Sequence, residues 1–191
     1  MPRRPNDFYP TEAGATRALL ERVALEGATI IEPCHGAGDI TLQLIQRADC
    51  RVITNDLDPS FAANYRLDAR LPSAWRKFID ENDYPIGPTW AVTNPPFIYA
   101  ADIARRALEH VPNVALLLRL TFLEPCEDRV MLLAERPPRR LIVLPRISFT
   151  NDGSTDSVTC AWFVWSDQVE PGIEVVPTLG PPHPMLEGLT E

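Results

Sequence analysis

Short apolar runs alternate with amphipathic segments between residues 28 and 165. Apolar runs rich in β-branched residues predict strands, whereas apolar positions spaced three and four residues apart predict helices. Strands are therefore expected at residues 28–32, 51–55, 65–68, 90–93, 114–118, 141–144 and 157–165. Helices are expected at residues 39–47, 59–64, 100–109 and 124–135, and the gap from Asp68 to Trp90 has room for one further helix and a loop.

This order of elements predicts the fold class. Strands that alternate with helices favour an α/β fold with a doubly wound, mainly parallel sheet, here of seven strands. The run at 157–165 follows the preceding strand without an intervening helix, so it is expected to be antiparallel. Residues 1–168 are predicted to form this domain. Residues 169–191 are rich in Pro and Gly and lack apolar periodicity, which predicts an extended or disordered tail.

Composition narrows the functional classes. The sequence has no apolar run of the ~18 residues that a membrane span needs, and no apolar leader follows Met1, so a cytoplasmic protein without membrane contact is expected. Four scattered cysteines and three histidines outside any cluster argue against a zinc site and against disulfides. The net charge of −8 argues against strong nonspecific binding of nucleic acid, although five arginines fall within residues 129–146.

Residues Asn94, Pro95, Pro96 and Phe97 follow the apolar run at 90–93 and are the most informative motif. Each proline fixes φ and restricts the residue before it, so the motif forms a rigid, extended turn with outward carbonyl oxygens. One amide side chain and one flat ring lie beside those oxygens. This set suits a planar substrate with an NH2 group. The alternative interpretation is an ordinary Pro-rich loop after a strand.

A second motif, Glu32-Pro-Cys-His-Gly-Ala-Gly38, connects the first expected strand to its helix. It is no phosphate-binding loop, because Gly-Lys-Ser/Thr does not follow, and it lacks the third glycine of the dinucleotide fingerprint. Asp56 follows the second strand, where an acid can accept hydrogen bonds from ribose hydroxyls. Asp68 could reach an adenine amine. The pattern indicates a nucleoside ligand without pyrophosphate, unless this is an ordinary tight turn with two surface acids.

In these motifs and their order, residues 6–166 resemble the class I (Rossmann-like) S-adenosylmethionine-dependent methyltransferases that act on adenine N6 in DNA, in particular the small enzymes of phages and prophages. The resemblance implies S-adenosylmethionine as cofactor, adenine in DNA as partner and the cytoplasm of a bacterial host cell as location. It implies no metal. Implied cofactor residues are Phe8, Pro10, Thr11, Glu32, Gly36, Gly38, Asp56 and Asp68.

The resemblance also implies the catalytic chemistry. Asn94 Oδ1 and the Pro95 carbonyl would accept the protons of the adenine amine, and Pro96 would complete the turn. Phe97 would stack on the adenine, which must be flipped out of a duplex. Residues 146–156 and 158–165 resemble the loop and strand near the target base, so Arg146 is a further candidate for substrate binding. Phe122 follows the strand expected at 114–118 and is also a candidate lining residue of the base pocket, with core packing as the alternative.

One departure and three alternatives remain. Members of this family usually carry a target-recognition region, for which the chain has no room, so low sequence specificity is expected. Protein glutamine N5-methyltransferases share the Asn-Pro-Pro-aromatic motif, but they usually have a helical region before the first strand. An RNA adenine N6-methyltransferase is the second alternative, and an inactive module that binds cofactor or a partner is the third. The oligomeric state is left open.

Overall fold

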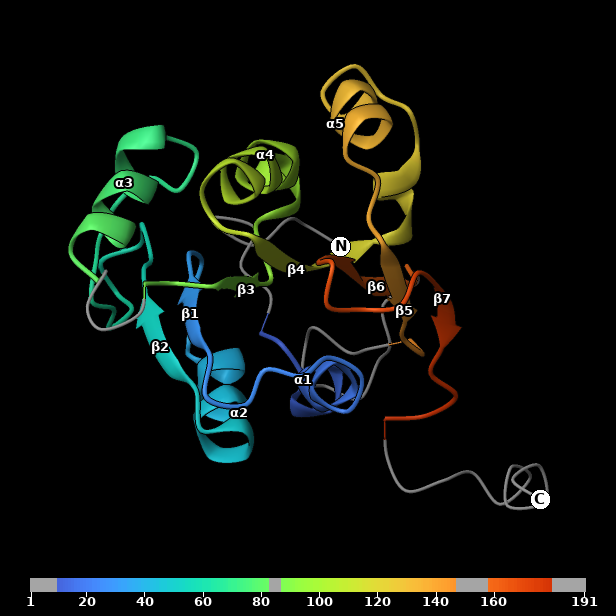
Figure 1. Cartoon of the computed structure of the whole chain (residues 1–191), viewed down its shortest axis with the longest axis horizontal. Helices are drawn as coiled ribbons and strands as arrows, with labels where there is room; N and C mark the ends of the chain where they lie inside the picture. Colours follow the sequence, from blue (N-terminus) through green and yellow to red (C-terminus); the bar gives the residue numbers. More distant parts are fainter. Residues whose placement is uncertain (1–9, 83–86, 147–157, 180–191) are drawn as a thin grey trace.

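The computed structural model of the protein describes residues 10–82, 87–146 and 158–179. These residues build a seven-stranded sheet in the order β2-β1-β3-β4-β6-β5-β7 (Figure 1). The strands are β1 (Thr29–Glu32), β2 (Arg51–Thr54), β3 (Trp90–Thr93), β4 (Asn113–Arg119), β5 (Arg140–Val143), β6 (Cys160–Trp165) and β7 (Gly172–Val175).

Helices cover both faces of the sheet, as the alternation of strands and helices predicts (Figure 1). One face carries α1 (Ala13–Leu20) and α2 (Asp39–Ala48). The other carries α3 (Pro72–Asp80), α4 (Ala100–His110) and α5 (Val130–Glu135). Each face has its own apolar cluster. The central strands β4 and β6 contribute to both clusters, which explains why they are apolar along almost their whole length.

Strand directions confirm the prediction of a mainly parallel sheet. The pairs β1–β2, β1–β3, β3–β4 and β5–β7 are parallel. Strand β6 is antiparallel to both of its neighbours, β4 and β5. The carboxyl ends of all the other strands therefore open toward the same edge of the sheet, where ligands bind in open α/β folds.

The segment after β2 differs from its prediction. The expected helix at residues 59–64 was wrong: these residues form a turn and bends, in which the Ser60 amide donates to the Asp58 carboxylate at 2.9 Å and the Phe61 amide to the Asp58 backbone carbonyl at 3.3 Å. Short polar side chains compete with helical hydrogen bonds in this way. The expected strand at 65–68 is reduced to one bridge between Asn55 and Tyr65. The helix expected between Asp68 and Trp90 is α3.

The segment after β4 also differs. Residues 120–123 form a short 3-10 helix and residues 124–129 form bends and turns, so α5 covers only the second half of the helix predicted at 124–135. Pro125 lacks a backbone donor, and the amide of Cys126 donates to the Glu124 carbonyl at 2.7 Å instead.

The predicted domain boundary at residue 168 falls before the last strand of the sheet. Strand β7 pairs with β5, and Glu174 bonds Arg22 Nε at 2.6 Å and also bonds Arg140. These contacts tie residues 172–175 to β5 and to the segment just after α1, although the local sequence is rich in Pro and Gly. Residues 180–191 of the predicted tail lie outside the described residues.

Candidate active site

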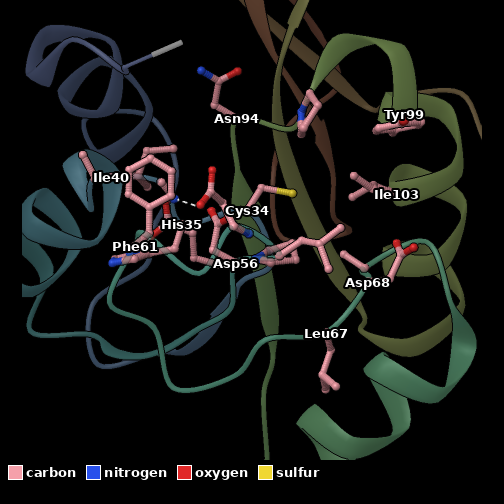
Figure 2. Close-up of a pocket in the computed structure, with 18 of the residues that line it drawn as sticks. Cys34, His35, Ile40, Asp56, Phe61, Leu67, Asp68, Asn94, Tyr99 and Ile103 are labelled. Carbon is pink, nitrogen blue, oxygen red and sulfur yellow. Dashed lines mark hydrogen bonds and ion pairs between the residues drawn. The ribbon is translucent and has the colours of Figure 1, made fainter. Parts of the chain in front are cut away.

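The loops that follow β1, β2 and β3 surround a cavity of about 550 Å³ (Figure 2). Parallel strands bring these loops to one edge of the sheet although they lie far apart in the sequence. Among the residues predicted for cofactor binding and catalysis, those that line the cavity are Thr11, Glu32, Gly36, Asp56, Asp68, Asn94 and Pro96. The sheet therefore gathers the three sequence motifs around one space.

Glu32 ends β1 and is a buried acid of this cavity, with 1% of its surface exposed. Its Oε2 accepts a hydrogen bond from the Thr41 hydroxyl of α2 and lies 3.1 Å from Nδ1 of His35. Burial raises the pKa of Glu32 above its ordinary value, and the hydrogen bond to Glu32 raises the pKa of His35. Glu32 and His35 therefore retain a proton to higher pH than either group does in water.

Gly36 and Gly38 turn the loop between β1 and α2. Their φ angles are 55° and 89°, in the left-handed region that favours glycine. A Cβ at position 38 would lie 3.0 Å from Cε1 of His35. Gly36 lines the cavity. Gly38 lies outside the lining; it caps the N-terminus of α2 and leaves room for the imidazole of His35.

Asp56 lies just beyond β2, and the backbone fixes its carboxylate. The amide of Gly36 donates to Oδ2 at 2.7 Å, and the amide of Asp58 donates to Oδ1 at 2.8 Å. Each carboxylate oxygen can accept more than one hydrogen bond. Asp56 is thus held in place with capacity for two hydroxyl donors of a ligand.

Asp68 lies on the opposite wall of the cavity, and Arg70 binds its carboxylate. Arg70 Nη2 lies 2.6 Å from Oδ2 and Nε lies 2.9 Å from Oδ1, which lowers the pKa of Asp68. The same guanidinium lies over the ring of Tyr99, 4.2 Å from its centroid. Arg70 and Tyr99 therefore form the cavity wall around Asp68, the residue that was predicted to contact an adenine amine.

Asn94 begins the turn after β3, and the N-terminal segment orients its side chain. Nδ2 of Asn94 donates to Oγ1 of Thr11 at 3.1 Å, and the Thr11 amide donates to Oδ2 of Asp39 at 3.1 Å. Pro10 precedes this contact but lies outside the main cavity. Phe8 lies outside the described residues. The hydrogen bond to Thr11 ties the Asn94 side chain to the segment that precedes α1.

Four other predicted residues lie away from the cavity lining. Pro95 is buried, and Phe97 is half-buried with the Arg119 guanidinium over its ring, 4.4 Å from the centroid. Phe122 is a core residue that packs edge to face on Phe163 at 5.5 Å, which disagrees with its predicted place in a base pocket. Arg146 is exposed, and residues 147–156 of the loop predicted to follow it lie outside the described residues.

Sequence reasoning missed several lining residues. His35, Arg70 and Tyr99 line the cavity, and Figure 2 shows Phe61 beside Ile40 and the thiol of Cys34 directed into the same space. Burial raises the pKa of that thiol well above its ordinary value, so it stays protonated. His35 stands three residues after Glu32 in a glycine loop, a spacing that could have indicated the pair.

Within residues 10–82, 87–146 and 158–179, no three His, Cys, Asp or Glu side chains are grouped as a metal site would require. In the same part of the chain, no helix is both long and apolar enough to cross a bilayer.

Comparison with known proteins gives a likeness at the level of structure. No protein-family model matches the sequence, and no curated protein is significantly similar to it. A type I restriction-modification methyltransferase subunit from Streptococcus thermophilus matches 88% of this chain with a TM-score of 0.54 at 13% identity. The match covers 47% of that subunit, so the chain spans about half its length.

Two further structures match most of both chains. A proposed RNA methyltransferase from Pyrococcus horikoshii has a TM-score of 0.53 at 13% identity, with 85% of this chain and 89% of that one covered. A proposed hemolysin from Lactococcus lactis has a TM-score of 0.55 at 14% identity, with 89% and 93% covered. Together with the seven-stranded sheet and its one antiparallel strand, these likenesses show that the chain has the Rossmann-like fold of class I methyltransferases.

Proposed function

We propose that this protein transfers a methyl group from S-adenosylmethionine to the N6 amine of adenine in DNA. The observation that carries the proposal is the position of Asn94. It begins a rigid Asn-Pro-Pro-Phe turn at the carboxyl end of β3, and its side chain is oriented by Thr11 at the mouth of an acid-lined cavity. Two of the similar structures carry methyltransferase names, one from a DNA restriction-modification system and one for RNA.

The cavity fits the proposed cofactor in charge and in hydrogen-bonding groups. S-adenosylmethionine carries a sulfonium and an ammonium group, and Glu32, Asp39, Asp56 and Asp68 all line the space. Asp56 is fixed by two backbone amides and offers acceptors for the ribose hydroxyls. Apolar side chains such as Leu67 and Ile103 also line the cavity and suit the flat adenine ring. When bound, the cofactor supplies an already activated methyl group.

The chain's own residues must make the adenine amine reactive, because its lone pair is delocalised into the ring. Oδ1 of Asn94 and the carbonyl of Pro95 would accept the two amine protons, which favours a tetrahedral nitrogen and exposes the lone pair. Thr11 holds the carboxamide in the required orientation. The protein then contributes positioning and charge complementarity, and no covalent nucleophile is needed.

The same site would bind the target base outside the DNA helix, since the amine is out of reach inside a duplex. Flipping costs a few kcal/mol, and the cost is lowest for a base that is already unpaired. Among the described residues, the elements between β3 and β6 are 3–11 residues long and leave little chain for reading neighbouring bases. We expect activity on single-stranded or locally opened DNA with little dependence on sequence.

Transfer of a tritiated methyl group tests the proposal. The full chain is incubated with labelled cofactor and with unmethylated DNA, RNA or a protein extract, and the products are digested to nucleosides or amino acids. We expect label in N6-methyladenine from DNA. Label confined to RNA or to protein glutamine would replace the DNA proposal with one of the two related activities.

A substitution separates chemistry from cofactor binding. Asn94→Ala removes the proposed acceptor and should reduce methyl transfer by about a hundredfold or more, an effect typical of losing one such group. Binding of S-adenosylmethionine, measured by calorimetry, should change little. Gln46→Ala is the matched control, because Gln46 is an exposed carboxamide of α2 away from the cavity. Full activity of Asn94→Ala would remove the catalytic role assigned to this residue.

A further inference from the structure

Arg119, which the sequence does not single out, lies directly against the proposed catalytic turn. It is the last residue of β4, the strand that pairs with β3, and its guanidinium lies over the Phe97 ring with Cζ 4.4 Å from the ring centroid. Phe97 also packs against the apolar cluster of the α1–α2 face. A planar cation therefore covers the ring to which the target adenine is assigned.

The sheet register places two arginines at this part of the edge. Arg119 pairs with Cys160 of β6, and the Cys160 carbonyl accepts a hydrogen bond from the Leu144 amide just after β5. Arg146 follows two residues later and is exposed. Neighbouring strands lie about 4.8 Å apart, so the ends of β4 and β5 stand roughly 10 Å from each other. Arg119 and Arg146 thus lie near each other at the carboxyl edge of the sheet, on the side of Phe97 away from the acidic cavity.

We propose that Arg119 is a substrate-positioning residue. In the free protein its guanidinium stacks on Phe97, where the target base would stack. When the base enters, the guanidinium moves away and binds a phosphate of the flipped nucleotide. The proposal rests on the proposed function, because it identifies the DNA-binding side of the same site. Cation–π and base–aromatic stacking are comparable in strength, so the exchange of guanidinium for base is inexpensive. The displaced guanidinium has five donors that match phosphate oxygens.

Phosphate binding predicts a dependence on salt that a structural role does not. Each phosphate contact on a single strand contributes about 0.7 to the slope of log K against log salt concentration. Loss of Arg119 should lower that slope by roughly this amount and weaken binding by about tenfold at low salt, the effect of one charge-assisted hydrogen bond.

The test uses a short single-stranded DNA with 2-aminopurine at the target position and the full-length protein. Affinity is measured by anisotropy at several salt concentrations for the wild type, Arg119→Lys and Arg119→Gln. The Lys variant keeps the charge and loses the planar group, whereas the Gln variant keeps a planar amide and loses the charge. We expect the salt slope to fall only for Gln. Emission of 2-aminopurine at saturation should match the wild type, since the base still reaches Phe97.

Controls make each outcome decisive. Arg76→Gln changes an exposed arginine on α3 and should leave both the slope and the affinity unchanged. Cofactor affinity should be the same in all variants. Equal slopes for the Lys and Gln variants, or an equal loss for Arg76→Gln, would overturn the inference. A charge effect confined to an RNA oligonucleotide would overturn its assignment to DNA. Because no methyl transfer is measured, the inference and the proposed function fail separately.

Discussion

The carboxyl edge of the sheet has two halves that carry different charged residues. Around β1 and β2, the cavity is lined by Glu32, Asp39, Asp56 and Asp68, and the lining arginine Arg70 is held by one of them. At the ends of β4 and β5 stand Arg119 and Arg146. The net charge of −8 averages over this separation. Overall charge is therefore an incomplete argument against a nucleic-acid partner, because part of the negative charge lines the cavity where a cationic cofactor is proposed to bind.

The Asn-Pro-Pro-Phe turn lies between the two halves and contacts both. Asn94 faces the acidic half through its hydrogen bond with Thr11, and Phe97 faces the other half through Arg119. A transfer reaction needs the cofactor and the substrate to be bound side by side, with the reacting groups a short distance apart. Substitutions in one half should therefore change one ligand's affinity and spare the other's.

The largest effect is expected for Asp56→Ala in the acidic half. The change removes the proposed ribose acceptor and leaves the amides of Gly36 and Asp58 without the partner that they have now. Hydrogen bonds to a charged group contribute about 1.5–3 kcal/mol each, so the affinity for S-adenosylmethionine should fall by about a hundredfold. Isothermal calorimetry measures this change.

The comparison of the two halves also requires that oligonucleotide affinity stay within about twofold in Asp56→Ala, well under 1.4 kcal/mol. Asp80→Ala, which changes an exposed acid at the end of α3, is the control for net charge. Parallel losses of cofactor and oligonucleotide binding in Asp56→Ala would show that the two halves are not independent.

A smaller effect is expected from Phe97→Leu in the arginine half. Leucine keeps an apolar contact with the core cluster but has no flat ring, and stacking of one base on an aromatic ring contributes about 1–3 kcal/mol. The KM for DNA should rise about tenfold or more, with cofactor affinity unchanged. Phe97→Tyr keeps the ring and should retain most of the activity. Steady-state kinetics with both substrates varied measures this, and an unchanged KM for DNA in Phe97→Leu would contradict the prediction.

The strands of this fold were predictable where they are buried on both faces. The runs at 114–118 and 141–144 match β4 and β5 closely, because central strands are apolar whatever surrounds them. Strand β7 was missed, since Ile173 and Val175 are exposed and Glu174 is held by Arg22 and Arg140 from distant segments. Its position depends on tertiary contacts that no local pattern contains.

The candidate site, like the fold, was predictable only in part. The glycine loop, Asp56 and Asn94 follow strands, and their convergence follows from parallel strands that end at one edge. The contacts of their side chains could not be predicted. Arg119 at the end of β4 reaches Phe97 in the turn after the neighbouring strand β3, and Phe122 turns into the core against Phe163 of β6. Such pairs depend on register and on side-chain direction, which the sequence pattern leaves open.

Strand β7 gives a prediction about stability that is specific to the arginine half. Glu174→Gln removes the charge that binds Arg22, just after α1, and Arg140 of β5. Glu174 is about one-third exposed, so solvent screens these pairs, and we expect the free energy of unfolding to fall by about 1 kcal/mol. Urea denaturation measures it. Glu170→Gln, an exposed neighbour, should have no effect, and cofactor affinity should stay constant in both variants.

The smallest effect concerns the acidic half and follows from His35. Its pKa is raised above the ordinary 6.5 by the hydrogen bond to Glu32, so the folded state keeps a proton that the unfolded state has released. Stability is therefore greatest below pH 6.5 and declines as the pH rises through the raised pKa of His35. The raised pKa of Glu32 acts in the same direction from 4.5 upward. In urea denaturation between about pH 5.5 and 8.5, His35→Gln should show a flatter profile than the wild type, because glutamine can bond Glu32 without titrating. The same slope in both proteins would mean that the pKa of His35 is not raised on folding.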